Sequence, residues 1–283
     1  CGIESMYLRI PVTRLIALVA AALLLAACST FTTPRNAPPN AAAAQQASLP
    51  DMPGVRAWAD EVPADAAAEI KRRVPTLANL GRYSKRIDGR PVVETLALSG
   101  GGGDGAFGAG VLTGWSARGD RPTFDIVTGV SAGAIIAPFA FLGRRYDAQL
   151  REIWTQYGTN EIVVSQILPG LLAGSALADT APLAELIARY INERLLAEIA
   201  REYHRGRILM IGTTNLDAQR PVVWNMGQIA ASGHPGALEL FRKIILASAA
   251  IPGAFPPVAI PVVTQGRLYE EMHVDGGTTR ELF

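Results

Sequence analysis

The chain has 283 residues, with 26 basic and 25 acidic side chains and a net charge of +1. A nearly neutral chain has no broad basic footprint, so we expect no nucleic-acid partner. Two cysteines and three histidines are too few for a disulfide framework or for a cysteine- or histidine-rich metal site. We therefore expect no metal and no cofactor.

The N-terminal segment has the pattern of a secretion signal. Residues 1–5 precede Met6, which we take as the translation start, so we expect residues 1–5 to be upstream read-through. Two arginines and a short apolar run, Leu15 to Ala27, follow. The run is too short for a comfortable membrane span but suits a signal peptide, which we assign to residues 6–27.

The first cysteine inside the reading frame marks the predicted cleavage point. Residues 25–28, Leu-Ala-Ala-Cys, resemble a bacterial lipobox, in which Cys28 would be diacylated and become the mature N-terminus. An ordinary signal peptide cut nearby is the alternative. Ser29 after the cysteine favours the outer membrane, facing the periplasm or the surface. Residues 28–50 are rich in Ala, Pro, Thr, Asn and Gln, which predicts a lipid-anchored flexible tether.

A helical lead-in, residues 51–90, is expected before the main domain, with an amphipathic helix at residues 64–74. The main domain begins near residue 91 with a buried strand, residues 92–98, which runs into four consecutive glycines. Bare backbone N–H groups in such a loop stabilise an anion, either a phosphate or a transition-state oxyanion. The phosphate alternative has support in Gly100-x-Gly102-x-x-Gly105 with Asp125 beyond it, although that acid begins a strand instead of ending one.

The next strand ends in Gly129-Val-Ser131-Ala-Gly133, and a small, apolar helix-like run follows. This strand–turn–helix context is what a nucleophile elbow needs. The glycines allow a turn that a Cβ on either side would block, and the serine hydroxyl projects into a cleft. A close-packed structural turn would look similar, so the motif becomes specific only together with others.

Alternating helices and strands predict one α/β unit for the rest of the chain. Helices are expected at 147–157 and 182–203, and strands at 207–212 and 221–225. Between these strands, Asn215 and Asp217 are predicted to form a turn or to line the cleft. The apolar residues 167–173 suit a lid or a core segment equally.

A third motif closes the chain. A short strand ends in Asp275, and Gly276 and Gly277 turn the backbone, which places a carboxylate at a strand end or forms an ordinary Asp-Gly turn. No histidine follows Asp275, so a Ser-Asp-His order is not available there. We expect His204 and His234 at the surface and His273 on the same side of its strand as Asp275, in a structural role.

Together, residues 100–110, 129–133, 247–257 and 275–277 resemble the patatin-like phospholipase family over about Val92 to Phe283. The resemblance implies a three-layer α/β/α fold with a mainly parallel sheet, and a serine–aspartate dyad that hydrolyses lipid acyl esters. Ser131 would be the nucleophile and Asp275 the general base. The backbone of four glycines would form the oxyanion hole: Gly100, Gly101, Gly102 and Gly103.

One position departs from the family pattern. Asp104 stands in the glycine loop where the family often carries Arg or Lys, and it would suit the N-terminus of the following helix. The chain ends eight residues after Asp275, where the family usually continues, so we expect the domain of residues 91–283 to be truncated and a chain ending there to be poorly soluble or inactive.

The resulting hypothesis is a lipid acyl-ester hydrolase of the phospholipase A, lysophospholipase or carboxylesterase type. It would act through an acyl-serine intermediate, with phospholipid or another acyl ester as substrate and a lipid anchor in the bacterial envelope. The alternative is a non-catalytic envelope lipoprotein that binds lipid or a partner.

Overall fold

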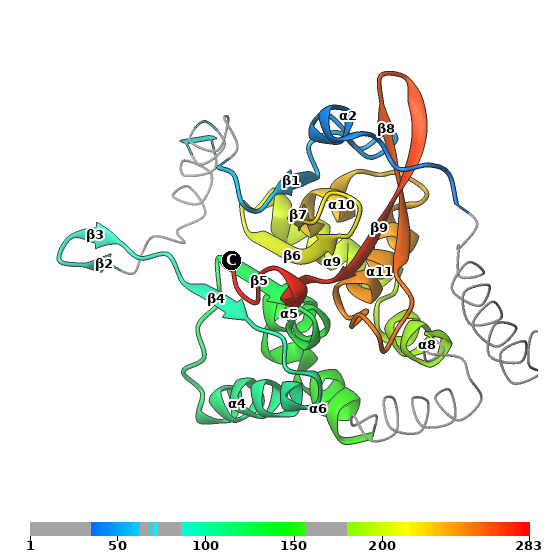
Figure 1. Ribbon diagram of the computed structural model, residues 1–283. Helices are drawn as coiled ribbons and strands as arrows, with labels where there is room; N and C mark the ends of the chain where they lie inside the picture. The colour runs from blue at the N-terminus through cyan, green and yellow to red at the C-terminus, as the bar shows by residue number, and fades with distance from the viewer. Residues whose placement is uncertain (1–34, 63–67, 69–70, 73–85, 157–179) are drawn as a thin grey trace, which may run out of the picture. The chain divides into compact units, whose positions relative to one another are not determined.

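Three parallel strands form the part of the sheet that follows the sequence prediction. The computed structural model describes residues 35–62, 68, 71–72, 86–156 and 180–283. Strands β4 (Thr95–Leu98), β5 (Ile126–Val130) and β6 (Ile208–Asn215) lie side by side in that order (Figure 1). β5 is buried along nearly its whole length, whereas β4 is half-exposed because no described strand pairs with its outer side.

The remaining pairings of this sheet are antiparallel, so our expectation of a mainly parallel sheet is wrong. β6 pairs antiparallel with β7 (Arg220–Asn225) and β9 (Arg267–Asp275). β7 pairs with β1 (Arg56–Trp58), and β9 pairs with β8 (Val258–Thr264). Short connections explain two of these pairings, β6 with β7 and β8 with β9, because a tight turn can join only antiparallel neighbours; the β1–β7 and β6–β9 pairs join segments far apart in the chain. The β8–β9 turn at Gln265 and Gly266 has two positive φ angles (51° and 71°), as type I′ hairpins require.

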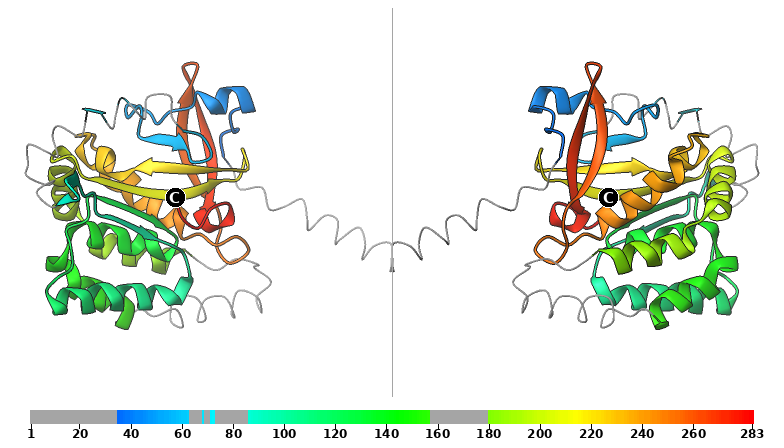
Figure 2. Two further views of the ribbon diagram at one scale, coloured as in Figure 1. Left: turned by 90° about the vertical axis from the view of Figure 1, so that its left-hand side faces the viewer. Right: turned by 90° about the vertical axis from the view of Figure 1, so that its right-hand side faces the viewer.

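β6 is the strand on which the rest of the sheet is arranged. β5 pairs with its first half and stops at the pair Val130↔Gly212. β9 then takes over the same edge of β6, and its last residue, Asp275, pairs with Thr213. Two strands that run toward each other therefore end at neighbouring positions of β6. Figure 2 shows the β8–β9 hairpin rising steeply from this edge.

The helices lie at the predicted positions in the chain, but one of the predicted helices is divided in two. The predicted helix at 147–157 is α6, and the single helix predicted at 182–203 is two helices, α8 and α9. Asn192 causes the break, because its side chain accepts the Leu195 N–H and caps α9. The bounds are α4 (Gly105–Arg118), α5 (Ala132–Leu142), α6 (Asp147–Gln156), α8 (Ala181–Tyr190), α9 (Glu193–His204), α10 (Met226–Ala231) and α11 (Ala237–Ser248).

One face of β5 and β6 carries a continuous layer of helices. α5, α10 and α11 contact these strands, and α9 contacts both α5 and α10. Residues of the other face, such as Thr128, meet the C-terminal segment, where the Thr128 hydroxyl donates to the carbonyl of Phe283 at 3.0 Å. The described contacts define one helical layer, so the second layer of the expected three-layer arrangement stays a prediction.

The segment before the main domain contributes to the same compact unit, which runs from Ala37 to Phe283. Helix α2 (Ala41–Gln45) is capped by Asn40, Ser48 bridges to Val263, and Leu49 and Met52 are buried. Residues 40–50, expected to belong to a tether, are therefore packed: Ala44 and Leu49 join the hydrophobic core, and Ser48 exchanges backbone hydrogen bonds with Val263 of β8. Strand β1 lies within the expected helical lead-in, and a small hairpin, β2 (Arg86–Ile87) and β3 (Arg90–Pro91), ends it.

Several predictions concern residues outside the described ranges: the signal peptide and Cys28, most of the helix at 64–74, and the apolar segment 167–173. Among the described residues, no helix is both long and apolar enough to cross a bilayer.

A buried arginine holds the end of the β5–α5 unit that lies away from Ser131. Arg207 donates to the carbonyl of Phe124, just before β5, and to the carbonyl of Phe141, in the last turn of α5. It also pairs with Glu202 of α9 at 3.0 Å. A fully buried guanidinium is tolerated only with such complete pairing. No sequence motif predicts this contact, which joins β5, α5 and α9.

Candidate active site

Ser131 occupies a strained turn between β5 and α5. Its backbone has φ 55° and ψ −122°, a conformation that costs a non-glycine residue about 1–3 kcal/mol. It stands at the N-cap of α5, yet its side chain makes no capping hydrogen bond. The hydroxyl is thus left available at the end of a helix whose first N–H groups favour negative charge. This is the predicted elbow geometry.

The two elbow glycines permit β5 and α5 to approach closely. A Cβ on Gly129 would lie 2.5 Å from the carbonyl oxygen of Gly133. A Cβ on Gly133 would overlap the carbonyl oxygen of Leu98, and it would lie 2.7 Å from that of Ser99. These neighbours are backbone atoms, which cannot move aside as a flexible side chain would. Both glycines are therefore required by packing.

The glycine loop passes directly over the serine. A Cβ on Gly100 would lie 3.0 Å from the Cβ of Ser131 and 3.6 Å from its Oγ. Gly101 and Gly102 have positive φ angles of 144° and 53°, which side chains disfavour. Within the described part of the chain, the N–H groups of Gly101, Gly102 and Gly103 have no hydrogen-bond acceptor. They are free donors beside the candidate nucleophile.

Asp104 lies in the turn that joins this loop to α4. It is exposed and stands at the N-cap of α4, the position that we expected, although its side chain makes no capping hydrogen bond. Solvent therefore screens the carboxylate.

Asp275 lies at the end of β9 and faces the same site. One carboxylate oxygen, Oδ1, accepts the N–H of Gly277 at 2.8 Å, so the two glycines of this turn fix the orientation of the side chain. The other, Oδ2, is buried and accepts no hydrogen bond from the described residues. The Ser131 hydroxyl nevertheless lies close enough to lower the pKa of Asp275. Both residues are nearly sealed from solvent, with 6% of Ser131 and 4% of Asp275 exposed.

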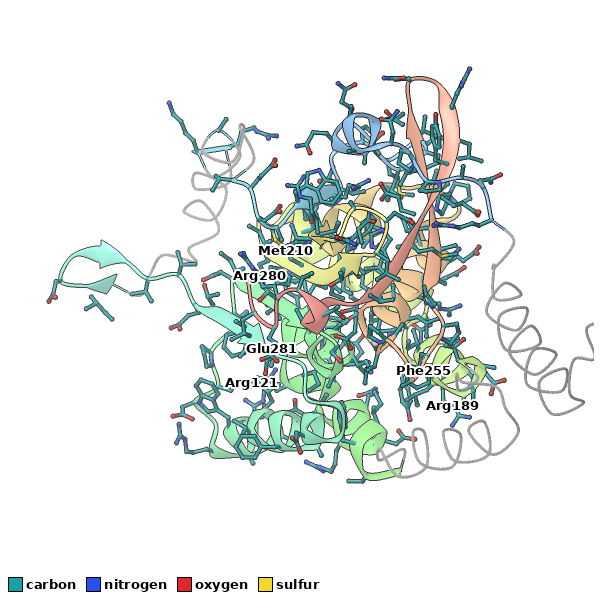
Figure 3. The ribbon with its side chains drawn as sticks, in the orientation of Figure 1. Arg121, Arg189, Met210, Phe255, Arg280 and Glu281 are labelled. Atoms are coloured by element: carbon teal, nitrogen blue, oxygen red, sulfur yellow. The ribbon has the colours of Figure 1, made fainter. Side chains whose placement is uncertain are left out.

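Burial makes this carboxylate a stronger base. The pKa of Asp275 is raised above its ordinary value, chiefly because desolvation disfavours the charged form. The nearby Ser131 hydroxyl and the hydrogen bond from Gly277 oppose the rise, and the negative charge of Glu281 adds to it. Glu281 follows the Asp275 turn on the C-terminal segment, where Figure 3 labels it beside Arg280. No sequence pattern had pointed to Glu281.

The three histidines take no part in the site. His204 is exposed at the end of α9, and His234 is in a loop, where its Nδ1 accepts the N–H of Gly236. His273 shares a face of β9 with Asp275, but it is fully buried and its Nδ1 lies 2.9 Å from Thr213 Oγ1. Burial lowers the pKa of His273. The structural roles that we expected for them agree with these contacts.

A buried polar network continues along β9 away from the site. The Trp224 indole N–H donates to the Thr213 hydroxyl, which also forms a hydrogen bond with Nδ1 of His273. Nε2 of His273 lies 3.5 Å from the carboxylate of Glu271, which forms a buried ion pair with Arg56 at 2.9 Å. Because no sequence motif joins β1, β6, β7 and β9, only the structure shows this network.

The turn after β6 contributes to a separate cavity. Asn215 accepts the N–H of Ala218 and so closes the turn at residues 216–219, as expected, whereas Asp217 lies in this turn and accepts the N–H of Met272 on β9. They also line a cavity of about 180 Å³ beside Glu271, whose walls include neither Ser131 nor Asp275. The cleft role that we considered for these residues therefore does not concern the serine site.

The C-terminal end of α11 contacts both halves of the candidate dyad. Ser248 accepts the N–H of Ser131, and the carbonyl of Ala250 accepts the N–H of Asp275 at 2.9 Å. This end falls within residues 247–257, the segment whose resemblance to a family motif was noted without a role. The signal was therefore in the sequence, but the contacts were not.

A family model described as patatin-like phospholipase matches residues 96–282. The chain belongs to the patatin-like phospholipase family. The match includes the glycine loop, the Ser131 elbow, the 247–257 segment and the Asp275 turn, and membership supports lipid hydrolase activity.

A second comparison adds a distant structural likeness. The crystal structure of VipD from Legionella pneumophila is 15% identical, with a TM-score of 0.40. The alignment covers 66% of this chain and 46% of VipD, so the chain spans less than half of that protein. No match is found among curated proteins.

The elbow packing can be tested with two glycine-to-alanine variants in helices. Gly133→Ala is expected to lower the free energy of unfolding by about 1–3 kcal/mol, because its Cβ overlaps backbone atoms of Leu98 and Ser99. Gly114→Ala, in open space on α4, is expected to raise it by about 0.5–1 kcal/mol. Denaturant unfolding measures both. Equal effects of the two variants would show that the elbow is not tightly packed.

Proposed function

We propose that this patatin-like protein hydrolyses acyl esters of lipids, of the phospholipase A, lysophospholipase or carboxylesterase type, through a Ser131–Asp275 dyad. One observation carries the proposal. β5 and β9 end at neighbouring residues of β6, which brings the hydroxyl of an elbow serine to a buried carboxylate. The site thus combines a nucleophile and a base of raised pKa without a histidine.

The proposed first step is attack on the ester carbonyl. Asp275 accepts the Ser131 hydroxyl proton as Oγ bonds to the carbonyl carbon. The tetrahedral intermediate then expels the alcohol, and Asp275 donates the proton that it took from Ser131 to the leaving oxygen. An acyl-Ser131 ester remains. In the second step Asp275 accepts a proton from water, the water oxygen attacks the acyl carbon, and the fatty acid leaves as Ser131 regains its proton.

The glycine loop supplies the charge stabilisation that both steps need. The free N–H groups of Gly101, Gly102 and Gly103 lie in the loop that passes over Ser131. Donors that are already in place cost no reorganisation when the oxyanion develops. The N-terminus of α5 adds a favourable dipole on the other side of Ser131.

We further propose that the protein is a bacterial lipoprotein of the outer membrane, attached through Cys28. The support is the lipobox-like sequence Leu-Ala-Ala-Cys after a signal-like apolar run. Several acyl chains on one cysteine give a firm membrane attachment. The anchor would hold the hydrolase close to lipid substrates.

The dyad predicts the effect of two conservative changes, one of which removes the hydroxyl and one the carboxylate charge. Ser131→Ala and Asp275→Asn are each expected to lower kcat for p-nitrophenyl esters by about 1,000-fold or more. A fluorophosphonate probe should label wild type at Ser131 and leave Ser131→Ala unlabelled.

Stability provides the control for these variants. Because folding raises the pKa of Asp275, its ionised form destabilises the fold once the pH rises through that pKa. Asp275→Asn should therefore be at least as stable as wild type at neutral pH. Activity that survives Ser131→Ala would overturn the mechanism. A folded, full-length wild type with neither turnover nor labelling would favour the non-catalytic lipoprotein that binds lipid or a partner.

The pH profile reports the state of the base. Since Asp275 must be ionised to accept a proton, kcat/KM should fall toward acid pH with a midpoint above the ordinary aspartate pKa. Glu281→Gln removes a charge that raises this pKa, so it should move the midpoint to lower pH. A midpoint that is the same in both proteins, at the ordinary aspartate value, would contradict the assignment of a desolvated base.

Lipidation of Cys28 is tested separately. Wild type expressed in a bacterium that processes lipoproteins should incorporate an alkyne-labelled fatty acid and have a mature N-terminus at Cys28. Cys28→Ala should lose the label. A mature, unlabelled N-terminus at another residue, found by mass spectrometry, would indicate an ordinary signal peptide.

A further inference from the structure

We infer that Ser248, at the end of α11, is a positioning residue that holds the nucleophile elbow in its reactive conformation. The inference rests on the proposed function, which assigns no role to this side chain. Ser248 is completely buried, and its hydroxyl touches two backbone groups of the site. It touches neither the Ser131 hydroxyl nor the Asp275 carboxylate by any described hydrogen bond, so its action is indirect.

The direction of both hydrogen bonds is fixed by chemistry. The N–H of Ser131 can only donate, so Ser248 Oγ accepts from it at 3.0 Å. The carbonyl of Gly212 can only accept, so the same hydroxyl donates to it at 2.6 Å. One hydroxyl proton and one lone pair thus bridge the two groups, and no other rotamer of the hydroxyl proton serves both.

The hydrogen bonds of Ser248 lie at the point where β5 stops pairing with β6. Val130↔Gly212 is the last paired position of β5 on β6. Ser131 lies beyond this pair, and its N–H donates to the Ser248 hydroxyl instead of to a carbonyl of β6. Ser248 supplies the missing acceptor and connects the turned residue back to β6. A residue in such a conformation persists only when its surroundings over-determine it.

The same helix end also holds the base. The carbonyl of Ala250, two residues after Ser248, accepts the N–H of Asp275. Ser131 and Asp275 are therefore both held through their backbone N–H groups by residues 248–250. This shared support holds the backbone of the nucleophile and the backbone of the base to one helix end.

Loss of the bridge should affect the reaction more than substrate binding. A displacement of the nucleophile by about 1 Å can cost 100-fold in rate. Ser248→Ala removes the hydroxyl with the smallest change in volume, and Ser248→Thr keeps a hydroxyl. Ser116 offers a matched control, because it is a buried serine on α4 whose hydroxyl accepts one hydrogen bond from Arg121, with no described contact to the site.

The experiment compares the full chain with Ser248→Ala, Ser248→Thr and Ser116→Ala. Steady-state hydrolysis of p-nitrophenyl butyrate, the rate of fluorophosphonate labelling, and amide hydrogen exchange of the peptide spanning Gly129–Gly133 are measured for each. We expect Ser248→Ala to lower kcat and the labelling rate by about 10- to 100-fold with KM nearly unchanged. Exchange at the elbow should become faster. Ser248→Thr should recover part of the activity, and Ser116→Ala should keep wild-type kcat.

Two results would overturn the inference: a folded Ser248→Ala protein with wild-type labelling and elbow exchange, or equal losses in Ser248→Ala and Ser116→Ala. An inactive, unlabelled wild type would instead overturn the proposed function. In that case the exchange of the Ser131 amide still decides whether Ser248 holds the elbow.

Discussion

The structure of this site depends on the pairing of β6 with two strands along one edge. β5 and β9 approach from opposite directions along β6. The last residue of β5 pairs with Gly212 and the last residue of β9 pairs with Thr213, so the two strand ends lie at consecutive positions of β6. The close contacts at this junction allow no side chain: a Cβ on Gly276 would lie 2.6 Å from the carbonyl oxygen of Gly212. Change the register of either strand by one residue, and its side chains would move to the opposite face of the sheet. The proximity of Ser131 and Asp275 is thus a consequence of strand register.

The strained turn at Ser131 is stabilised from both ends of the β5–α5 unit. At the end away from the serine, Arg207 joins the residue before β5 to the last turn of α5. At the serine itself, Gly129 and Gly133 allow the close approach, and Ser248 satisfies the N–H that leaves the ladder. Conformational strain at a functional site persists in this way, because the packing around it leaves no relaxed alternative.

Two buried polar groups on β9 have opposite electrostatic surroundings. Glu271 is paired with Arg56 and lies beside a neutral His273, so its charge is compensated within the fold. Asp275, four residues further, has no basic partner among the described residues, and desolvation raises its pKa. A carboxylate that is compensated serves stability, whereas one that is not is available as a base. The difference arises from which strands lie opposite each residue.

The sequence by itself determined the local chemistry: a glycine loop, an elbow serine and an aspartate before two glycines. Steric demands of a few adjacent residues suffice for these predictions, as the strained φ of Ser131 illustrates. It also predicted α6 and the strands at β6 and β7, which local periodicity specifies. It did not predict the antiparallel half of the sheet, β8, the packing of residues 40–50, or the roles of Ser248, Glu281 and Arg207. These features depend on contacts between residues far apart in the chain, such as Gly212 with Ser248. A periodic hydrophobic pattern shows which side of a helix or strand is buried, but it does not show which other helix or strand packs against that side. Only the tertiary structure decided that β9 would continue the line of β5 along β6, and this brought Asp275 to Ser131.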